Sequence, residues 1–548
     1  MTQSDYWYKN GLIYNLDVET FLDGNGDGVG DFIGLMSRLD HLERLGVTAL
    51  WLLPFYPSPN RDNGYDVIDY YGIDPRHGDF GDFVEMCHEA NGRGIRILID
   101  LVINHTSDEH PWFQAARKDR RSPYRDFYIW SDEPFDTGKE PIFKGEEDSV
   151  WTWDDEAGQY YYHRFYHFEP DLNFANPRVR EELRKIMGFW LQLGVHGFRL
   201  DAASHMIEDK AGLQPEDPHG VLVDIHRFSR LRRGGAVLLG EADVDADELG
   251  EFFGKGDELQ LLLNFLLTNY IFLALARDSA EPVRRGLKLL PQRPKEGQWA
   301  NFLRNHDELD LERLTEEERA EVMDRFAPEE TMRIYDRGIR RRVAPMLDGD
   351  RDWMELAYSL LFAMPGIPLI RYGQEIGMGE DLSLDERNSV RTPMQWSREN
   401  NAGFSDADKK DLVAPVIKEG AFGYQKVNAA DQHRDRESFL SWMQQLIRVR
   451  KSCPEIGWAD PQILECGSED VLVLRNEWDG GEVVTIHNLS RDERAVRIPL
   501  DPQDLERMEI ILSPDGLPEW DQKTGEITMG GHGFLWIRVR TSKSHSGM

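Results

Sequence analysis

The chain reads HGFRLDAASH over residues 196–205, VLLGEADVD over 237–245 and NFLRNHDEL over 301–309. In each stretch, apolar residues that favour a strand lead into one carboxylate, which is Asp201, Glu241 or Asp307. A (β/α)₈ barrel gathers residues from the carboxyl ends of its strands around one pocket. The repeated pattern therefore predicts three acids at one site. A retaining glycosidase needs such acids as nucleophile, as acid/base and to steady the sugar cation.

Eight strand-like runs alternate with helical patterns along most of the chain, which is typical of a parallel α/β fold. Because eight such strands close a barrel, we predict the α/β class and a TIM barrel. Helical periodicity predicts helices over 33–46, 179–194 and 437–452. The predicted strands are residues 12–21, 47–55, 95–103, 196–203, 236–242, 259–265, 299–306 and 366–373.

Two intervals are too long for simple crossovers between barrel elements. Residues 104–175 are rich in aromatic residues, proline, glycine and charge, so we expect an inserted subdomain over the barrel mouth after the third strand. A second insert is expected over about 376–430, and short strands with turn signals after Pro454 predict an antiparallel β domain. The predicted domains are a barrel over 1–103 and 176–455, an inserted subdomain over 104–175, and a β-sandwich-like domain over 456–548 with a disordered end at 541–548.

Composition narrows the range of partners. The 548 residues carry a net charge of −35, which argues against nucleic acid and against anionic membrane surfaces. Three cysteines without a CxxC pair give no disulfide framework, and the first residues lack a signal-peptide pattern, so we expect a cytoplasmic protein. Self-association as a homo-oligomer stays open. The apolar stretch 259–276 is interrupted by polar residues and is expected to be a buried strand followed by a buried helix.

Neighbouring residues suggest different roles for the three acids. Arg199 lies two residues before Asp201, on the same side of the strand, and would keep that carboxylate ionised as a nucleophile requires. Glu241 follows an apolar run, which would raise its pKa and suit an acid/base. Asp307 has polar neighbours and could stabilise an oxocarbenium ion, while Asp100 is expected to hold Arg199.

Other motifs are compatible with sugar or metal binding. Tyr65 beside Asp66 offers an aromatic face and a carboxylate, as in a sugar subsite, although a packed loop is the alternative. His105 could be a base, a sugar-binding donor or a buried core histidine. In DGNGDGVGD (23–31), alternating oxygen-bearing side chains with glycines between them suit Ca²⁺, whereas the alternative is a solvated turn.

The chain resembles glycoside hydrolase family 13, the α-amylase family. The ordered blocks DLVINH (100–105), GFRLDA (197–202), LLGEAD (238–243) and FLRNHDE (302–308) are similar to its four signature regions. This resemblance implies that Asp201 is the nucleophile, Glu241 the acid/base and Asp307 the transition-state stabiliser. It further implies a substrate subsite of Tyr65, Asp66, His105, Arg199 and His306, with Arg391 as a weaker candidate. A structural Ca²⁺ would be held by Asp23, Asn25, Asp27, Asp31 and a carbonyl near Val29, with no organic cofactor.

Longer segments, including LRNHDELDLERLTEEER (303–319) and SVRTPMQWSRENNAGFS (389–405), are similar to the family's trehalose synthases. The implied substrate is a small α-glucoside such as maltose, isomerised to trehalose by double displacement. Hydrolysis by an α-glucosidase and glucosyl transfer to another acceptor stay open. A non-enzymatic sugar-binding member would be expected to lose acids, and all three are present.

The chain also departs from the pattern of those enzymes. Glu169 stands where glutamine is usual, DAASH replaces DAVPYL, GEAD replaces AEAN, and Arg371 stands where tyrosine is usual. These departures lie near the predicted pocket or its rim. They leave the double displacement intact and leave the glucosyl acceptor undecided.

Overall fold

The computed structural model describes residues 3–499, 502–505, 507–514, 519–521 and 524–539. Eight parallel strands form a closed barrel in the order β1-β14-β10-β9-β8-β7-β3-β2. Each overlaps one of the eight runs predicted from the sequence, so the prediction of a TIM barrel is confirmed. The strands are β1 (Ile13–Leu16), β2 (Ala49–Leu52), β3 (Arg96–Leu101), β7 (Gly197–Leu200), β8 (Val237–Gly240), β9 (Leu261–Leu263), β10 (Gln298–Asn301) and β14 (Ile367–Arg371).

Alternate residues of the barrel strands belong to two separate apolar clusters. Leu239 of β8 packs with Trp51, Leu98 and Leu369 in one cluster, whereas its neighbour Leu238 packs with residues of the surrounding helices. Successive side chains of a strand point to opposite faces, so one cluster fills the barrel and the other lies beneath the helices. The near-continuous apolar runs in the sequence follow from this burial on both faces.

The predicted helices are present with shifted ends. Helix α6 (Pro177–Gln192) begins at Asn176, whose side chain accepts the Arg178 N–H at 3.0 Å. The expected helix over 33–46 is two helices, α2 (Phe32–Ser37) and α3 (Leu39–Leu45), because Arg38 between them leaves helical dihedrals. The third predicted helix is α16 (Phe439–Lys451).

The apolar stretch 259–276 is a buried strand followed by a buried helix, as predicted. Strand β9 leads into α10 (Phe265–Arg277), and most of the side chains of that helix are buried. Over the described part of the chain, no helix is both long and apolar enough to cross a membrane.

Two long segments interrupt the barrel on the side of the strand carboxyl ends. Residues 104–175 contain α5 (Pro111–Lys118) and a three-stranded antiparallel sheet of β4 (Trp130–Ser131), β6 (Gln159–Tyr162) and β5 (Trp151–Asp154). A segment between β10 and β14, which was not predicted, adds α12 (Glu316–Phe326) and a small sheet. The strands of this sheet are β11 (Leu309–Asp310), β13 (Gly338–Ile339) and β12 (Arg333–Ile334). Each is only two residues long, so the sequence shows no alternation of apolar and polar residues that would predict a strand.

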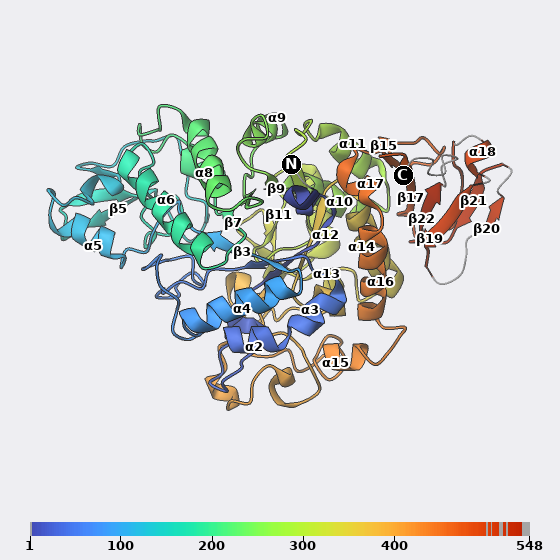
Figure 1. Ribbon diagram of the computed structural model, residues 1–548, viewed down its shortest axis with the longest axis horizontal. Helices are drawn as coiled ribbons and strands as arrows, with labels where there is room; N and C mark the ends of the chain where they lie inside the picture. Colours follow the sequence, from blue (N-terminus) through green and yellow to red (C-terminus); the bar gives the residue numbers. More distant parts are fainter. Residues whose placement is uncertain (1–2, 500–501, 506, 515–518, 522–523, 540–548) are drawn as a thin grey trace.

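Two antiparallel sheets follow the barrel at the opposite end of the molecule from α5 and β5 (Figure 1). The larger has the order β15 (Gln462–Ile463), β16 (Val471–Trp478), β17 (Gly481–Asn488), β22 (Phe534–Val539) and β19 (Met508–Leu512). The smaller has the order β18 (Arg494–Arg497), β21 (Glu526–Met529) and β20 (Glu519–Asp521), and one apolar cluster draws residues from both sheets. Trp536 donates its indole N–H to Ser359 Oγ at 2.9 Å, which joins β22 (Phe534–Val539) to α14 (Arg351–Ala363) of the barrel. The expected antiparallel domain is therefore present; its exact boundaries stay predictions, and residues 541–548 lie outside the described part.

Candidate active site

The predicted nucleophile and acid/base leave adjacent barrel strands at the same end. Asp201 directly follows β7, and Glu241 directly follows β8, which pairs with β7 in parallel. The residue after the first acid, Ala202, has a left-handed backbone (φ 46°), and its N–H donates to Glu241 Oε2 at 3.0 Å. The turn after β7 thus holds the Glu241 carboxylate next to Asp201.

Arg199 connects three carboxylates. Its Nη1 lies 2.8 Å from Asp100 Oδ1 and 2.6 Å from Asp201 Oδ1, and its Nη2 lies 2.7 Å from Glu241 Oε2. The guanidinium is 1% exposed and lies over the Trp51 ring. Asp100 also accepts the Trp51 indole N–H at 2.9 Å, so it holds Arg199 as the sequence predicted.

The settings predicted for Asp201 and Glu241 differ from the structure in two respects. Burial raises the pKa of Asp201 well above its usual range, and the charges of Glu241 and Asp100 add to this effect against the opposing charge of Arg199. Burial likewise raises the pKa of Asp100 to about 6. Three carboxylates share one guanidinium, so Arg199 does not keep all of them ionised. Glu241 does not occupy an apolar setting either, because it pairs with that same arginine.

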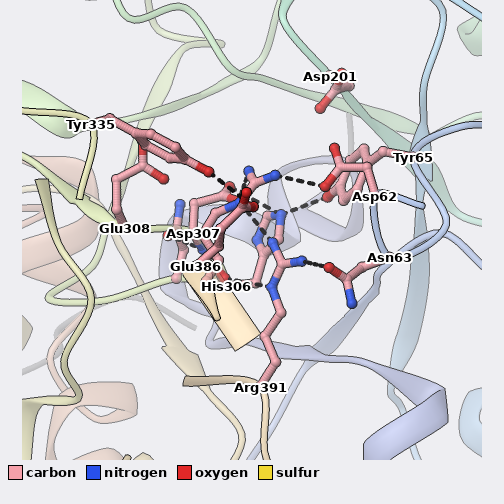
Figure 2. A network of polar contacts seen from close by, with 12 residues as sticks. Asp62, Asn63, Tyr65, Asp201, His306, Asp307, Glu308, Tyr335, Glu386 and Arg391 are labelled. Atoms are coloured by element: carbon pink, nitrogen blue, oxygen red, sulfur yellow. Dashed lines mark hydrogen bonds and ion pairs between the residues drawn. The ribbon is translucent and has the colours of Figure 1, made fainter. Parts of the chain in front are cut away.

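Asp307 lies in a different charge environment, shown in Figure 2. Its Oδ1 lies 2.8 Å from Arg387 Nη1 and 3.1 Å from Arg391 Nη2, and its Oδ2 lies 3.1 Å from His306 Nε2. Burial alone would raise the pKa of Asp307, but His306 and the two arginines lower it well below the usual range. Asp307 is therefore an anion, which suits the stabilisation of a cationic transition state.

Tyr65 and His306 form one stacked unit beside Asp307. Their rings lie 5.6 Å apart with an interplanar angle of 7°, and the Tyr65 hydroxyl lies 2.6 Å from His306 Nε2. Burial lowers the pKa of His306 well below its usual value, against the opposing charge of Asp307. Arg391 reaches the same group, since its Nε–H donates to the His306 carbonyl at 3.0 Å.

A cavity of about 360 Å³ opens over these residues, a size suited to a small ligand. It brings together five of the sequence-predicted residues, namely Tyr65, His105, Asp201, Glu241 and Asp307. Arg199, His306 and Arg391 lie behind the lining, in contact with its acids. Asp66 is not brought to the cavity, because its carboxylate accepts hydrogen bonds from Ser58 at 2.6 Å and from Arg61 at 3.3 Å.

His105 and Glu169 face each other at the cavity wall. His105 lines the cavity, and burial lowers its pKa to about 4, so the ring is neutral. Glu169, one of the departures from the family pattern, is fully buried, and its Oε1 lies 3.8 Å from His105 Nε2. Another departure, Arg371, is buried behind the site with its Nη1 3.4 Å from Asn15 Oδ1.

Phe143 lines the cavity and packs with Tyr166 and Tyr335 in an aromatic cluster, called here the aromatic roof. The ring of Phe143 lies 4.4 Å from that of Tyr166 and 5.1 Å from that of Tyr335, so the 104–175 and β10–β14 segments meet there. Both tyrosine hydroxyls donate to Glu386 Oε2, at 3.0 and 3.3 Å. Three segments that are distant in sequence therefore build the roof.

Several lining residues were missed in the sequence. Asp62 and Arg387 both line the cavity and pair at 2.7 Å, and the Arg387 guanidinium lies over the Phe143 ring. Arg313 and Arg337 also line the cavity. Arg313 lies within the 303–319 segment that is similar to trehalose synthases, but that resemblance gave it no role at the site. None of the four lies in the aromatic-rich interval 104–175, so nothing in the sequence indicated that they would reach the cavity.

The predicted calcium loop is held by its own backbone. Asp23 Oδ1 accepts the N–H groups of Asn25 and Gly26 at 3.0 and 2.6 Å, and Asp31 caps α2 by accepting the Gly34 N–H at 2.6 Å. The side chains of Asn25 and Asp27 accept the N–H groups two residues ahead, ending with that of Val29. Across the described residues, His, Cys, Asp and Glu side chains converge closely enough to share an ion only at Asp243, Asp310 and Glu312. The loop supplies hard oxygen donors that suit Ca²⁺, and its calcium site stays a prediction.

The family model for the alpha amylase catalytic domain matches residues 18–458. The chain belongs to the alpha-amylase family. Trehalose synthase from Thermus thermophilus is 43% identical to it over 541 residues, which cover 97% of this chain and 56% of that protein. Trehalose synthase from Pimelobacter sp. (strain R48) is 40% identical over 550 residues, covering 97% and 96% of the two chains. The chain thus spans little more than half of the first relative and nearly all of the second.

Solved structures of the family share the fold. An alpha-amylase from H. orenii superposes with a TM-score of 0.79 at 26% identity, covering 97% of this chain and all of the other. The trehalulose synthase MutB from Pseudomonas mesoacidophila MX-45 gives a TM-score of 0.78 at 25% identity, covering 97% and 99%. The barrel and its appended sheets are therefore common to relatives that are named for different activities.

Replacing Asp100 with asparagine tests whether the carboxylates compete for Arg199. Asp201 must be ionised to attack, so activity falls as the pH drops through its raised pKa. Asp100→Asn removes one neighbouring negative charge, which lowers the pKa of Asp201 and should move the acid limb of kcat/KM to lower pH. The pH profile can be measured with an aryl α-glucoside. Asp154→Asn, which removes a buried carboxylate paired with Arg117 in the inserted sheet, is the control. An acid limb that does not move in Asp100→Asn would contradict the shared-charge interpretation.

Proposed function

We propose that this protein is a retaining α-glucosyltransferase that isomerises maltose to trehalose. The observation that carries the proposal is the placement of Asp201 and Glu241 on the two Nη atoms of one guanidinium. A single guanidinium holds two carboxyl groups close together, as the short separation of about 5 Å in a retaining glycosidase requires, with no space for a water between them. The trehalose synthase relatives support the choice of substrate and product.

The first half-reaction uses the proposed roles of the three acids. Asp201 Oδ bonds to the anomeric carbon while the glycosidic C–O bond breaks, and Glu241 transfers its proton to the leaving oxygen. Positive charge on the sugar ring is greatest in the transition state, when the glycosidic bond is largely broken and the bond to Asp201 is only partly formed. Asp307, held ionised by Arg387 and Arg391, lies in the cavity lining where it can stabilise that charge. Tyr65, with its hydroxyl against His306, and His105 would contact the glucosyl ring.

The second half-reaction decides the product. The released glucose stays in the cavity and turns, so that its anomeric hydroxyl oxygen attacks the glucosyl–Asp201 ester. Glu241 then takes the proton of that hydroxyl as the ester C–O bond breaks. If water attacks in its place, the products are two glucose molecules. Retention of the sugar and exclusion of water are thus the physical requirements for isomerisation, and the aromatic roof supports the proposal that this cavity meets them.

Incubation with maltose distinguishes the candidate activities. We expect trehalose as the main product and free glucose as the minor one, because the released sugar is enclosed with the glucosyl ester. Chromatographic separation of maltose, trehalose and glucose over time provides the measurement. Mostly glucose with little trehalose would identify a hydrolytic α-glucosidase. Turnover that requires an added acceptor would favour transfer to another sugar or alcohol.

We also propose that residues 23–31 bind a structural Ca²⁺. Ca²⁺ prefers oxygen ligands, and the loop offers the side chains of Asp23, Asn25, Asp27 and Asp31 with the carbonyl of Val29. Binding to the folded state alone would stabilise it by roughly 3 kcal/mol when calcium is at 100 times its Kd. Thermal unfolding should therefore shift upward with calcium, reverse with a chelator and respond less in Asp27→Asn. Identical curves in all conditions would mean that the loop needs only its own hydrogen bonds.

A cytoplasmic location and self-association stay predictions.

A further inference from the structure

We propose that Arg313 and Arg337 form an ionic latch that keeps water from the glucosyl ester and so sets the ratio of isomerisation to hydrolysis. This proposal rests on the proposed function. Both residues belong to the segment between β10 and β14, and both line the cavity. Neither residue contacts Asp201 or Glu241 in the ion pairs of the site, so each would act as a positioning residue.

Arg313 ties this segment to the loop after β8. Its Nε lies 3.1 Å from Asp243 Oδ1, and its Nη1 lies 2.7 Å from Asp245 Oδ1. Asp243 stands two residues after the proposed acid/base, Glu241, and lines the same cavity. The side chain of Arg313 is 13% exposed, so the pair with Asp243 is partly protected from screening by salt.

Arg337 ties the same segment to the inserted subdomain. Its Nη1 donates to the carbonyl of Ile142 at 3.0 Å, and its Nε lies 2.5 Å from Asp310 Oδ2. Ile142 directly precedes Phe143, whose ring contacts Tyr335 of the β10–β14 segment. Arg337 thus holds the inserted subdomain against the β10–β14 segment beside the aromatic roof.

The two arginines offset a concentration of negative charge at the rim. Carboxylate oxygens of Asp243, Asp310 and Glu312 all lie within 4.8 Å of one another, although they come from two different segments. Burial, together with the charge of Asp310, raises the pKa of Asp243 to about 8. Loss of Arg313 would remove the ion pairs that join the β8 loop to the β10–β14 segment. Loss of Arg337 would remove the bonds to Ile142 and Asp310, so either change would loosen the contact between the segments around the cavity.

Separation of these segments has a defined chemical consequence. The glucosyl–Asp201 ester is broken by whichever oxygen reaches its anomeric carbon, and Glu241 takes the proton of the attacking group in either case. A glucose hydroxyl gives trehalose, whereas water gives glucose. An open rim admits water and lets the retained glucose leave, so the latch would affect the ratio of products more than the rate at which the ester forms.

The test measures the fraction of product released as glucose from maltose at equal, low conversion. We expect this fraction to rise about fivefold in Arg313→Gln and in Arg337→Gln, a size typical of coupled charges. Arg313→Lys keeps the positive charge and should restore part of the trehalose yield. A variant that only folds poorly would lose total activity but would keep the wild-type ratio, because the ratio is a property of the active molecules.

Arg277→Gln is the matched control. Arg277 pairs with Glu321 at 2.7 Å between α10 and α12, outside the cavity lining, so its loss should leave the product ratio unchanged. If wild-type enzyme makes trehalose and both latch variants keep its ratio, the latch is contradicted while the proposed function stands. If wild-type enzyme releases only glucose, the proposed function fails and the latch fails with it.

Discussion

The buried guanidinium of Arg199 is the interaction on which the site depends. It lies between β3 and β8 and contacts carboxylates that follow or belong to three barrel strands. A buried cation is stable only when its charge is compensated, and here three carboxylates lie against its two Nη atoms. The same contacts place Asp201 and Glu241 side by side. The requirement to pair one buried arginine thus also sets the geometry that a double displacement needs.

The charge distribution divides the cavity floor into two parts. On one side, Asp100, Asp201 and Glu241 share Arg199, and burial raises the pKa of the first two. On the other side, Asp307 lies against two arginines, one of which also pairs with Asp62, and its pKa is lowered. Asp307 stays anionic, so it can stabilise the cationic sugar ring while Asp201 attacks the anomeric carbon. The pairing of each acid, rather than its residue type, therefore distinguishes the proposed roles.

The sequence predicted the barrel because its signal is local and repeated. Apolar runs such as VLLG before Glu241 are strands buried on both faces, and an acid after such a run reaches the carboxyl end of the barrel. The pairing of Glu241 with Arg199 could not be predicted, because it depends on two strands being adjacent in space. Arg387, Arg313 and Arg337 were missed for a related reason. They lie in irregular segments without periodicity, and only tertiary contacts bring them to the cavity.

The most direct measurement of the central claim is to trap the covalent intermediate. A 2-deoxy-2-fluoro or 5-fluoro glucosyl fluoride forms the ester quickly and releases it slowly, because fluorine destabilises the cationic transition state and fluoride is a good leaving group. Mass spectrometry of the digested protein then locates the sugar. We expect a glucosyl ester on the side chain of Asp201, in the peptide that contains it. A sugar on Glu241, on Asp307 or on no residue while the reagent is turned over would contradict it.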